Sequence, residues 1–193
     1  MNNPKNNNDH LKLMSDEELI KGCIKGKESY QFEVYKRFSP KMFGLCLRYC
    51  ANRMEAEDVL QDGFIKVFNK IDTFKFTGSF EGWIRKIMIH TALRNKYVTI
   101  RSHEVYSFEG VEHPSTDEKV TSNLSLMDLM KLVNELPQGY KLVFNLFAVE
   151  GYSHKEIAEM LQIQEATSRS QYLRARQFLR EKLDKIKKDE FGI

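Results

Sequence analysis

The chain has 193 residues, room for one ordinary domain or two small ones, and its formal net charge at pH 7 is only +3. A charge this small excludes nucleic-acid binding through general basicity, so any such binding must come from local clusters. Ten Gly and four Pro provide few turns, which favours an all-α fold over a sheet-rich one.

No apolar run approaches the roughly 18 residues needed to span a bilayer, and the N-terminal stretch is polar and rich in Asn. We therefore expect a cytoplasmic protein without membrane insertion, with residues 1–13 as a disordered polar tail. Cys23, Cys46 and Cys50 have neither disulfide nor zinc spacing, and we interpret them as reduced core thiols. The sequence predicts no metal site and no cofactor.

A first helical region is predicted over residues 14–98. It opens with a capping box, in which Ser15 and Glu18 can exchange hydrogen bonds at the start of a helix. Apolar side chains then recur at spacings of three and four up to Cys50, but Ser39-Pro40 interrupts the pattern, so the segment is one helix or two. Further amphipathic helices are predicted near residues 55–71 and 79–96.

The helix near residues 55–71 has polar side chains opposite its apolar ones. They are Asp58, Gln61, Asp62 and Lys66. Such a mainly acidic face suits a basic partner helix. A solvated face that binds nothing is the alternative, and charge alone does not decide between the two.

The helix over residues 79–96 carries cationic and polar side chains along one side, and two aromatic residues precede it. The members are Lys86, His90, Thr91, Arg94 and Asn95 in the helix, and Phe74 and Phe76 in the loop. Cations for phosphates beside polar groups and aromatic platforms are what single-stranded bases require. Trp83 is predicted to belong to the core.

Between residues 99 and 123 the helical periodicity fails, and the composition turns to Ser, His, Glu, Thr, Asp and Pro. This pattern is typical of a flexible linker, and its length argues against one compact domain. We therefore predict two domains that reorient relative to each other when a partner binds.

The second domain is predicted over residues 124–188, with helical runs at 126–136, 137–149, 153–161 and 165–187. Ser153 and Glu156 form a second capping box, which opens the short third helix, and the long fourth helix follows after three or four residues. A short helix, a tight turn and a long helix indicate a helix-turn-helix. His154, just inside the cap, is predicted to be exposed and without a catalytic role.

In the long helix Ser168, Tyr172, Ala175 and Leu179 recur at the spacing of an inward face. The outward side chains suit base edges, and the later cations suit phosphates. The outward set is Arg169, Ser170, Leu173, Arg174 and Gln177, followed by Arg176, Arg180 and Lys182. A solvated basic helix that closes a bundle is the alternative interpretation.

Three segments occur in the order found in one protein family. They read EAEDVLQDGFIKVF at 55–68, FEGWIRKI at 80–87, and GYSHKEIAEML with TSRSQYLRAR at 151–161 and 167–176. Together with Leu136-Pro137, Tyr140 and Val143 upstream of the last segment, they resemble the extracytoplasmic-function (ECF) sigma factors, which direct bacterial RNA polymerase to promoters. The resemblance covers roughly residues 14–183.

The resemblance implies two small helical domains joined by a flexible linker: sigma domain two at 14–98, and sigma domain four at 124–188, a winged-helix-like helix-turn-helix. The implied partners are core RNA polymerase, promoter DNA and an anti-sigma factor, with no small-molecule substrate. Domain two would bind the polymerase clamp through Asp58, Gln61, Asp62 and Lys66, and the melted minus-ten element through Lys86, His90, Thr91, Arg94, Asn95 and Phe76. Domain four would read the minus-thirty-five duplex through Thr167, Arg169, Ser170, Leu173, Arg174 and Arg176.

The chain departs from the family pattern at four positions. Gln162 stands where the turn often has Gly, and its Cβ makes a left-handed conformation more costly. Ser168 replaces an inward Val, Gln171 replaces an Arg, and His90 replaces a frequent Asn. These changes predict an altered promoter preference on an intact fold.

An enzyme and a regulator that acts without polymerase are the two alternative classes of function. The sequence contains no GxSxG, HExxH or CxxC motif, so we expect a protein that is not an enzyme. A helix-turn-helix regulator that binds duplex DNA without polymerase is the remaining alternative. It accounts for residues 153–187 but not for the segments at 55–68 and 80–87.

Overall fold

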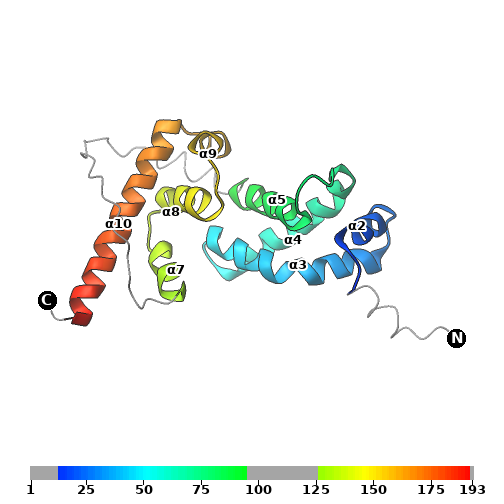
Figure 1. The fold of residues 1–193 in the computed structure, drawn as a ribbon, viewed down its shortest axis with the longest axis horizontal. Coiled ribbons are helices and arrows are strands. Elements are labelled where there is room, and N and C mark those ends of the chain that lie inside the picture. The colour runs from blue at the N-terminus through cyan, green and yellow to red at the C-terminus, as the bar shows by residue number, and fades with distance from the viewer. Residues whose placement is uncertain (1–12, 95–125, 192–193) are drawn as a thin grey trace. The chain divides into compact units, whose positions relative to one another are not determined.

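The computed structural model describes residues 13–94 and 126–191, which form helices joined by turns and contain no strand (Figure 1). Contacts between Cα atoms divide the chain into two compact units, Met1–Asn95 and Lys96–Ile193. The predicted all-α fold with two helical parts is thereby confirmed. The predicted linker at 99–123 and residues 1–12 of the predicted tail lie outside the described residues. No helix in the described parts is long and apolar enough to cross a membrane.

The first unit consists of α2 (Asp16–Ile24), α3 (Glu28–Tyr49), α4 (Arg53–Lys70), the 3-10 turn η1 (Ile71–Thr73) and α5 (Phe80–Arg94). The capping box of Ser15 and Glu18 is present at the start of α2, as predicted. Helix α3 packs against α2, α4 and α5, so it forms the centre of the unit. The largest fully buried side chains are Leu19, Ile20, Val34, Met42, Leu45, Ile84, Met88, Ile89 and Leu93.

Helix α3 is continuous through Pro40, so the interruption of the apolar pattern at Ser39-Pro40, which left one helix or two open, does not divide this helix. A proline in a helix interior removes one backbone hydrogen bond and costs about 3 kcal/mol or more. Phe38 and Met42, before and after the proline, are only 5% and 0% exposed. Because Pro40 itself lies on the exposed side, burial of its neighbours keeps both halves of the helix aligned.

Helices α4 and α5 approach each other closely at Gly63. A Cβ atom at this position would lie 2.2 Å from Sδ of Met88, whose side chain is 0% exposed. The missing side chain therefore leaves the space that Met88 fills. The contact sets the spacing between the two helices that carry most of the predicted first-unit site residues.

The second unit consists of α7 (Leu126–Asn134), α8 (Gln138–Phe144), the π-helical turn η2 (Asn145–Val149), α9 (His154–Leu161) and α10 (Glu165–Phe191). Helix α10 packs against α7, α8 and α9. The buried apolar side chains are Leu132, Val133, Leu136, Leu142, Val143, Leu146, Ile157, Met160, Leu161 and Ala175. A strand that could form a wing is absent from residues 126–191, so their helix-turn-helix is not of the winged type that we predicted.

The turn between α9 and α10 is the helix-turn-helix turn. The Ser153 and Glu156 capping box opens α9, as predicted. Gln162 ends α9 in the left-handed conformation, with φ 51° and ψ 43°. Gln162 thus adopts the left-handed conformation that the turn requires, although Gly would adopt it at a lower conformational cost.

Candidate polymerase and nucleic-acid interfaces

Helix α4 presents an acidic face made of Asp58, Gln61 and Asp62, all of which are exposed. The opposite side is buried, since Val59 and Val67 are 1% and 0% exposed. This is the arrangement predicted from the spacing. Neither carboxylate has an ion-pair partner among the described residues, so both remain available to an external cation.

Lys66 does not belong to this acidic face, although we predicted it there. Its side chain is half-buried, and its Nζ donates a hydrogen bond of 3.1 Å to Oγ1 of Thr91 on α5. The lysine thus links α4 to α5. Helical spacing placed Lys66 on the polar side of α4. It could not show that the side chain bonds to Thr91, because Thr91 belongs to another helix.

A groove of ≈ 390 Å³ lies between α3 and α4, and Gln61 belongs both to it and to the acidic face. Its lining residues are Tyr35, Ser39, Pro40, Phe43, Arg53, Glu57, Leu60 and Gln61. Arg53 donates to Glu57 over 2.7 Å and lies 5.1 Å from the centre of the Phe43 ring. The sequence gave no sign of this groove, because it forms only where two helices meet.

Helix α5 carries a basic stripe of Lys86, His90 and Arg94, which are all exposed and spaced four residues apart. Burial lowers the pKa of His90, and the positive charges of Lys70 and Lys86 lower it further. Lys70, at the end of α4, therefore adds a cation near the stripe that helical spacing within α5 could not reveal.

Thr91 and Asn95 were predicted beside this stripe. Thr91 is only 4% exposed; its hydroxyl donates to the carbonyl oxygen of Ile87 over 2.8 Å and accepts from Lys66. Its side chain is therefore engaged inside the unit and does not present a hydroxyl to a base. Asn95 lies outside the described residues.

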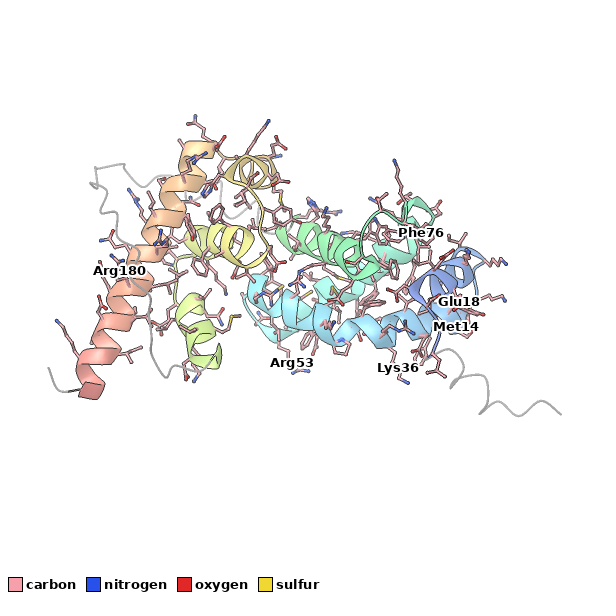
Figure 2. All side chains as sticks on the ribbon, viewed as in Figure 1. Met14, Glu18, Lys36, Arg53, Phe76 and Arg180 are labelled. Atoms are coloured by element: carbon pink, nitrogen blue, oxygen red, sulfur yellow. The ribbon has the colours of Figure 1, made fainter. Side chains whose placement is uncertain are left out.

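The two loop aromatics have different positions. Phe74 is 8% exposed, and its ring centre lies 5.4 Å from that of Phe80 and 5.6 Å from that of Trp83, so it is a core residue and not a platform. Phe76 is 50% exposed and has a left-handed φ of 57°, which is unfavourable for a bulky side chain (Figure 2). The loop thus holds one aromatic ring outward, while Trp83 is half-buried and stacked on Phe80.

Two of the four residues predicted to face inward from α10, Ser168 and Ala175, are 0% exposed. The other two, Tyr172 and Leu179, are half-buried. Arg169, Leu173 and Arg176 are exposed, and Leu173 retains 43% of its surface. Arg169 forms an ion pair with Glu165 one turn earlier. Arg180 is exposed further along the same helix (Figure 2).

Thr167 and Ser170 are half-buried at the start of this surface. The Ser170 hydroxyl donates to the carbonyl oxygen of Thr167 over 3.0 Å. We refer to residues 167–170 as the reading turn. It contains one exposed cation, Arg169, and two partly accessible hydroxyl groups, those of Thr167 and Ser170, beside the exposed Leu173; its third hydroxyl, that of Ser168, is buried.

Two α10 side chains point back toward α8. Arg174, predicted outward, is half-buried, and its Nη1 donates to the Tyr140 hydroxyl over 3.3 Å. The Gln171 amide lies 3.3 Å from where a Cβ of Gly139 would be. Gln171 thus packs against α8. Having Gln in place of Arg at this position therefore does not by itself remove a phosphate contact.

His154 is half-buried, so the prediction that it is exposed was wrong. Its Nδ1 lies 3.0 Å from Oγ of Ser168, and its ring stacks on Phe147 with centres 4.3 Å apart. Burial lowers its pKa, the Arg169 charge lowers it further, and Glu165 opposes this effect. The buried hydroxyl of Ser168 needs a hydrogen-bond partner, and helical spacing in the sequence does not show which residue provides it.

The cysteines are free thiols in the buried interior of the first unit, as predicted. Burial raises the pKa of Cys23 to about 11 and that of Cys46 to about 12. Within the described residues, no three His, Cys, Asp or Glu side chains gather as they would around a metal ion.

Two family models match the two units. "Sigma-70 region 2" matches residues 34–101, and "Sigma-70, region 4" matches residues 126–179. The chain belongs to the sigma-70 family. The region 2 match includes the acidic face and the basic stripe, and the region 4 match includes the helix-turn-helix with its reading turn.

Curated relatives of this sigma factor support the ECF resemblance. It is 28% identical to the RNA polymerase sigma-H factor of Pseudomonas aeruginosa over 177 residues, which cover 84% of this chain and 90% of that protein. It is 26% identical to the ECF RNA polymerase sigma-E factor of Haemophilus influenzae over 187 residues, covering 90% and 97% of the two chains. These names confirm the family predicted from the sequence motifs.

Solved structures similar to the sigma factor include RpoE in complex with the anti-sigma factor NepR from Bartonella quintana. That match has a TM-score of 0.48 and 22% identity, and covers 79% of this chain and 95% of the other. Another is CnrH in complex with the cytosolic domain of CnrY, with a TM-score of 0.49, 20% identity, and coverage of 88% and 97%. Since both TM-scores are below 0.5, the family assignment rests on the family models and the curated relatives.

Proposed function

We propose that this sigma factor binds the clamp of core RNA polymerase through the acidic face of α4 and directs initiation at a specific class of promoters. The observation that supports this most strongly is the exposure of Asp58 and Asp62 on a helix whose other side is buried. Two carboxylates without ion-pair partners among the described residues fit a basic partner surface. Lys66 is omitted from the proposed contact because it is engaged with Thr91.

Within this proposal, residues 14–98 act as domain two, 99–123 as the linker and 124–188 as domain four. Domain two would also capture the melted minus-ten strand. Lys70, Lys86 and Arg94 would neutralise phosphates, His90, whose pKa is lowered, would contribute a neutral hydrogen-bonding group, and Phe76 would stack on a base. Thr91 is left out of this surface since its hydroxyl is already engaged, and Asn95 stays a prediction from the sequence.

Domain four would read the minus-thirty-five element as duplex, with α10 in the major groove. Arg169 can bond the two acceptors of a guanine once it leaves Glu165, and Leu173 offers an apolar contact to a thymine methyl. Thr167 and Ser170 supply hydroxyls, while Arg176 and Arg180 lie further along for phosphates. Arg174 would reach DNA only by releasing Tyr140.

The protein would have no catalytic site of its own, since its relatives are sigma factors. It would act in the bacterial cytoplasm. We also propose control by an anti-sigma factor, as the resemblance to the ECF sigma factors implies; within the first unit Phe32 and Ile65 expose 59% and 58% of their surfaces, and a protein partner could cover either side chain. The RpoE and CnrH structures each contain such a partner or its domain. This proposed control is tested by adding a candidate anti-sigma factor to the protein and core polymerase, and the expected result is loss of binding to core polymerase.

Core binding can be tested with the full-length chain labelled by a fluorophore and titrated with purified core polymerase. Asp58→Lys with Asp62→Lys should weaken binding at least tenfold, because two attractive contacts become repulsive. Glu17→Lys with Asp72→Lys makes the same change in net charge elsewhere on the first unit and should bind like the unmodified protein. Equal affinities for the two double variants would contradict the proposed face.

A further inference from the structure

His154 and Ser168 form a polar pair inside the interface between α9 and α10. Ser168 is 0% exposed, and its Oγ lies 3.0 Å from Nδ1 of His154, the first residue of α9. A buried hydroxyl without a partner bears the full cost of its lost hydration. The imidazole therefore satisfies a group that would otherwise destabilise the interface.

The orientation of this imidazole is fixed by its surroundings. Its ring is nearly parallel to that of Phe147 in η2, with an interplanar angle of 10°, and its centre lies 5.8 Å from the Tyr172 ring on α10. The Arg169 charge and burial both disfavour protonation, against the opposing charge of Glu165. The hydrogen bond consequently joins two neutral groups in a defined geometry that connects η2, α9 and α10.

The rest of α10 is anchored without this pair. Ala175, two turns later, is 0% exposed and packs with Val133 and Leu136. Arg174 is bonded to Tyr140 on α8. Loss of the pair would therefore leave the middle of α10 docked, and would release mainly its first turn. The released residues include part of the reading turn at 167–170, because Ser168 lies between Thr167 and Arg169.

We propose that the His154–Ser168 pair positions the reading turn of α10 against DNA and thereby determines how strictly the upstream promoter element is recognised. This inference rests on the proposed function of domain four. A displacement of the turn by about 1 Å, less than the rise of one helical residue, would misalign the Arg169 fork with the paired acceptors of a guanine. Contacts to phosphates tolerate such a shift better, because they depend mainly on charge.

The test uses holoenzyme assembled from core polymerase and each full-length variant. The first probe is a promoter duplex enriched from a random library by the unmodified holoenzyme, and the second is the same duplex with its upstream element scrambled. Ser168→Ala removes the hydroxyl, and His154→Phe keeps the aromatic stack but removes Nδ1. The double variant completes the cycle, and His154→Asn restores a polar atom near the Nδ1 position.

Ser168→Ala and His154→Phe should each lower the affinity ratio between the two probes by about 3- to 10-fold, the range expected from one net hydrogen bond. Affinity for the scrambled duplex should stay within about twofold. The double variant should be no worse than either single variant, because both remove the same bond. His154→Asn should recover part of the ratio.

A matched control separates positioning from stability. Leu132→Ala creates a cavity under α7 and should destabilise domain four, yet it should leave the affinity ratio of the folded holoenzyme unchanged. The inference is overturned if Leu132→Ala lowers the ratio equally, if both probes lose affinity together, or if the two single effects multiply. If even the unmodified holoenzyme shows no preference for the enriched duplex, then the proposed function of domain four fails, and the inference fails with it.

Discussion

Replacing Gly63 by Ala should destabilise domain two by about 1–3 kcal/mol, the usual cost of overpacking a core. The added Cβ would lie 2.2 Å from Sδ and 2.9 Å from Cε of Met88, both shorter than real Cβ contacts. Met88 is 0% exposed and cannot swing into solvent, so either its rotamer or the spacing of α4 and α5 must change. This penalty exceeds the gain of about 0.5–1 kcal/mol that Ala has over Gly inside a helix.

Gly44→Ala is the matched control. Gly44 lies inside α3, is exposed, and has no atom within 4 Å of the Cβ position. The same substitution should there stabilise the protein by about 0.5–1 kcal/mol. Trp83 is the only tryptophan in the chain and packs, half-buried, against the core residues Phe74 and Phe80 of domain two, so its fluorescence during urea unfolding reports that domain within the full-length protein.

A cycle with Met88→Ala locates the cause. If the clash with Met88 is responsible, Met88→Ala should cost less in the Gly63→Ala background than in the unmodified protein. The reasoning is refuted if Gly63→Ala is as stable as Gly44→Ala, or if the effects of Gly63→Ala and Met88→Ala simply add.

Three further outcomes are expected. Because burial raises the pKa of Cys23 to about 11 and of Cys46 to about 12, the folded protein at pH 7.5 should react with iodoacetamide far more slowly than the urea-unfolded chain; equal rates by mass spectrometry would contradict this. The pKa of His154 lies below its ordinary 6.5 in the folded state, so the unfolded chain binds the extra proton, and stability should be level above pH 6.5 and fall below it. Urea unfolding followed by circular dichroism at pH 7.5 and 5.5 should show a smaller fall in His154→Asn, and an identical fall would exclude this histidine as a cause. Arg176→Ala should lower the slope of log affinity against log salt for promoter binding by about one, whereas Lys21→Ala on α2 should leave it unchanged.

Local features of the fold were predictable from the sequence. The capping boxes at Ser15 and Ser153 depend on residues three positions apart, and both are present as predicted. The buried sides of α4 and α10 follow from the helical period, which also gave the exposure of Asp58 and Arg169 correctly. These predictions succeeded because one helix alone determines them.

Features that depend on a second helix were missed. Lys66 and Thr91 bond to each other across α4 and α5, and Arg174 turns toward Tyr140 on α8, although spacing predicted all three for partner surfaces. Helix α3 continues through Pro40 because neighbouring side chains are buried against other helices. Periodicity gives the direction of a side chain from its own axis, but not the neighbour that it meets.

The most direct measurement of the central claim is run-off transcription with purified core polymerase on genomic fragments, with and without this protein. The account predicts discrete new transcription starts that appear only when the protein is present and are lost with Asp58→Lys and Asp62→Lys, but retained with Glu17→Lys and Asp72→Lys. An absence of new starts, together with tight binding of the protein alone to duplex DNA, would contradict the account and favour a regulator that acts without polymerase.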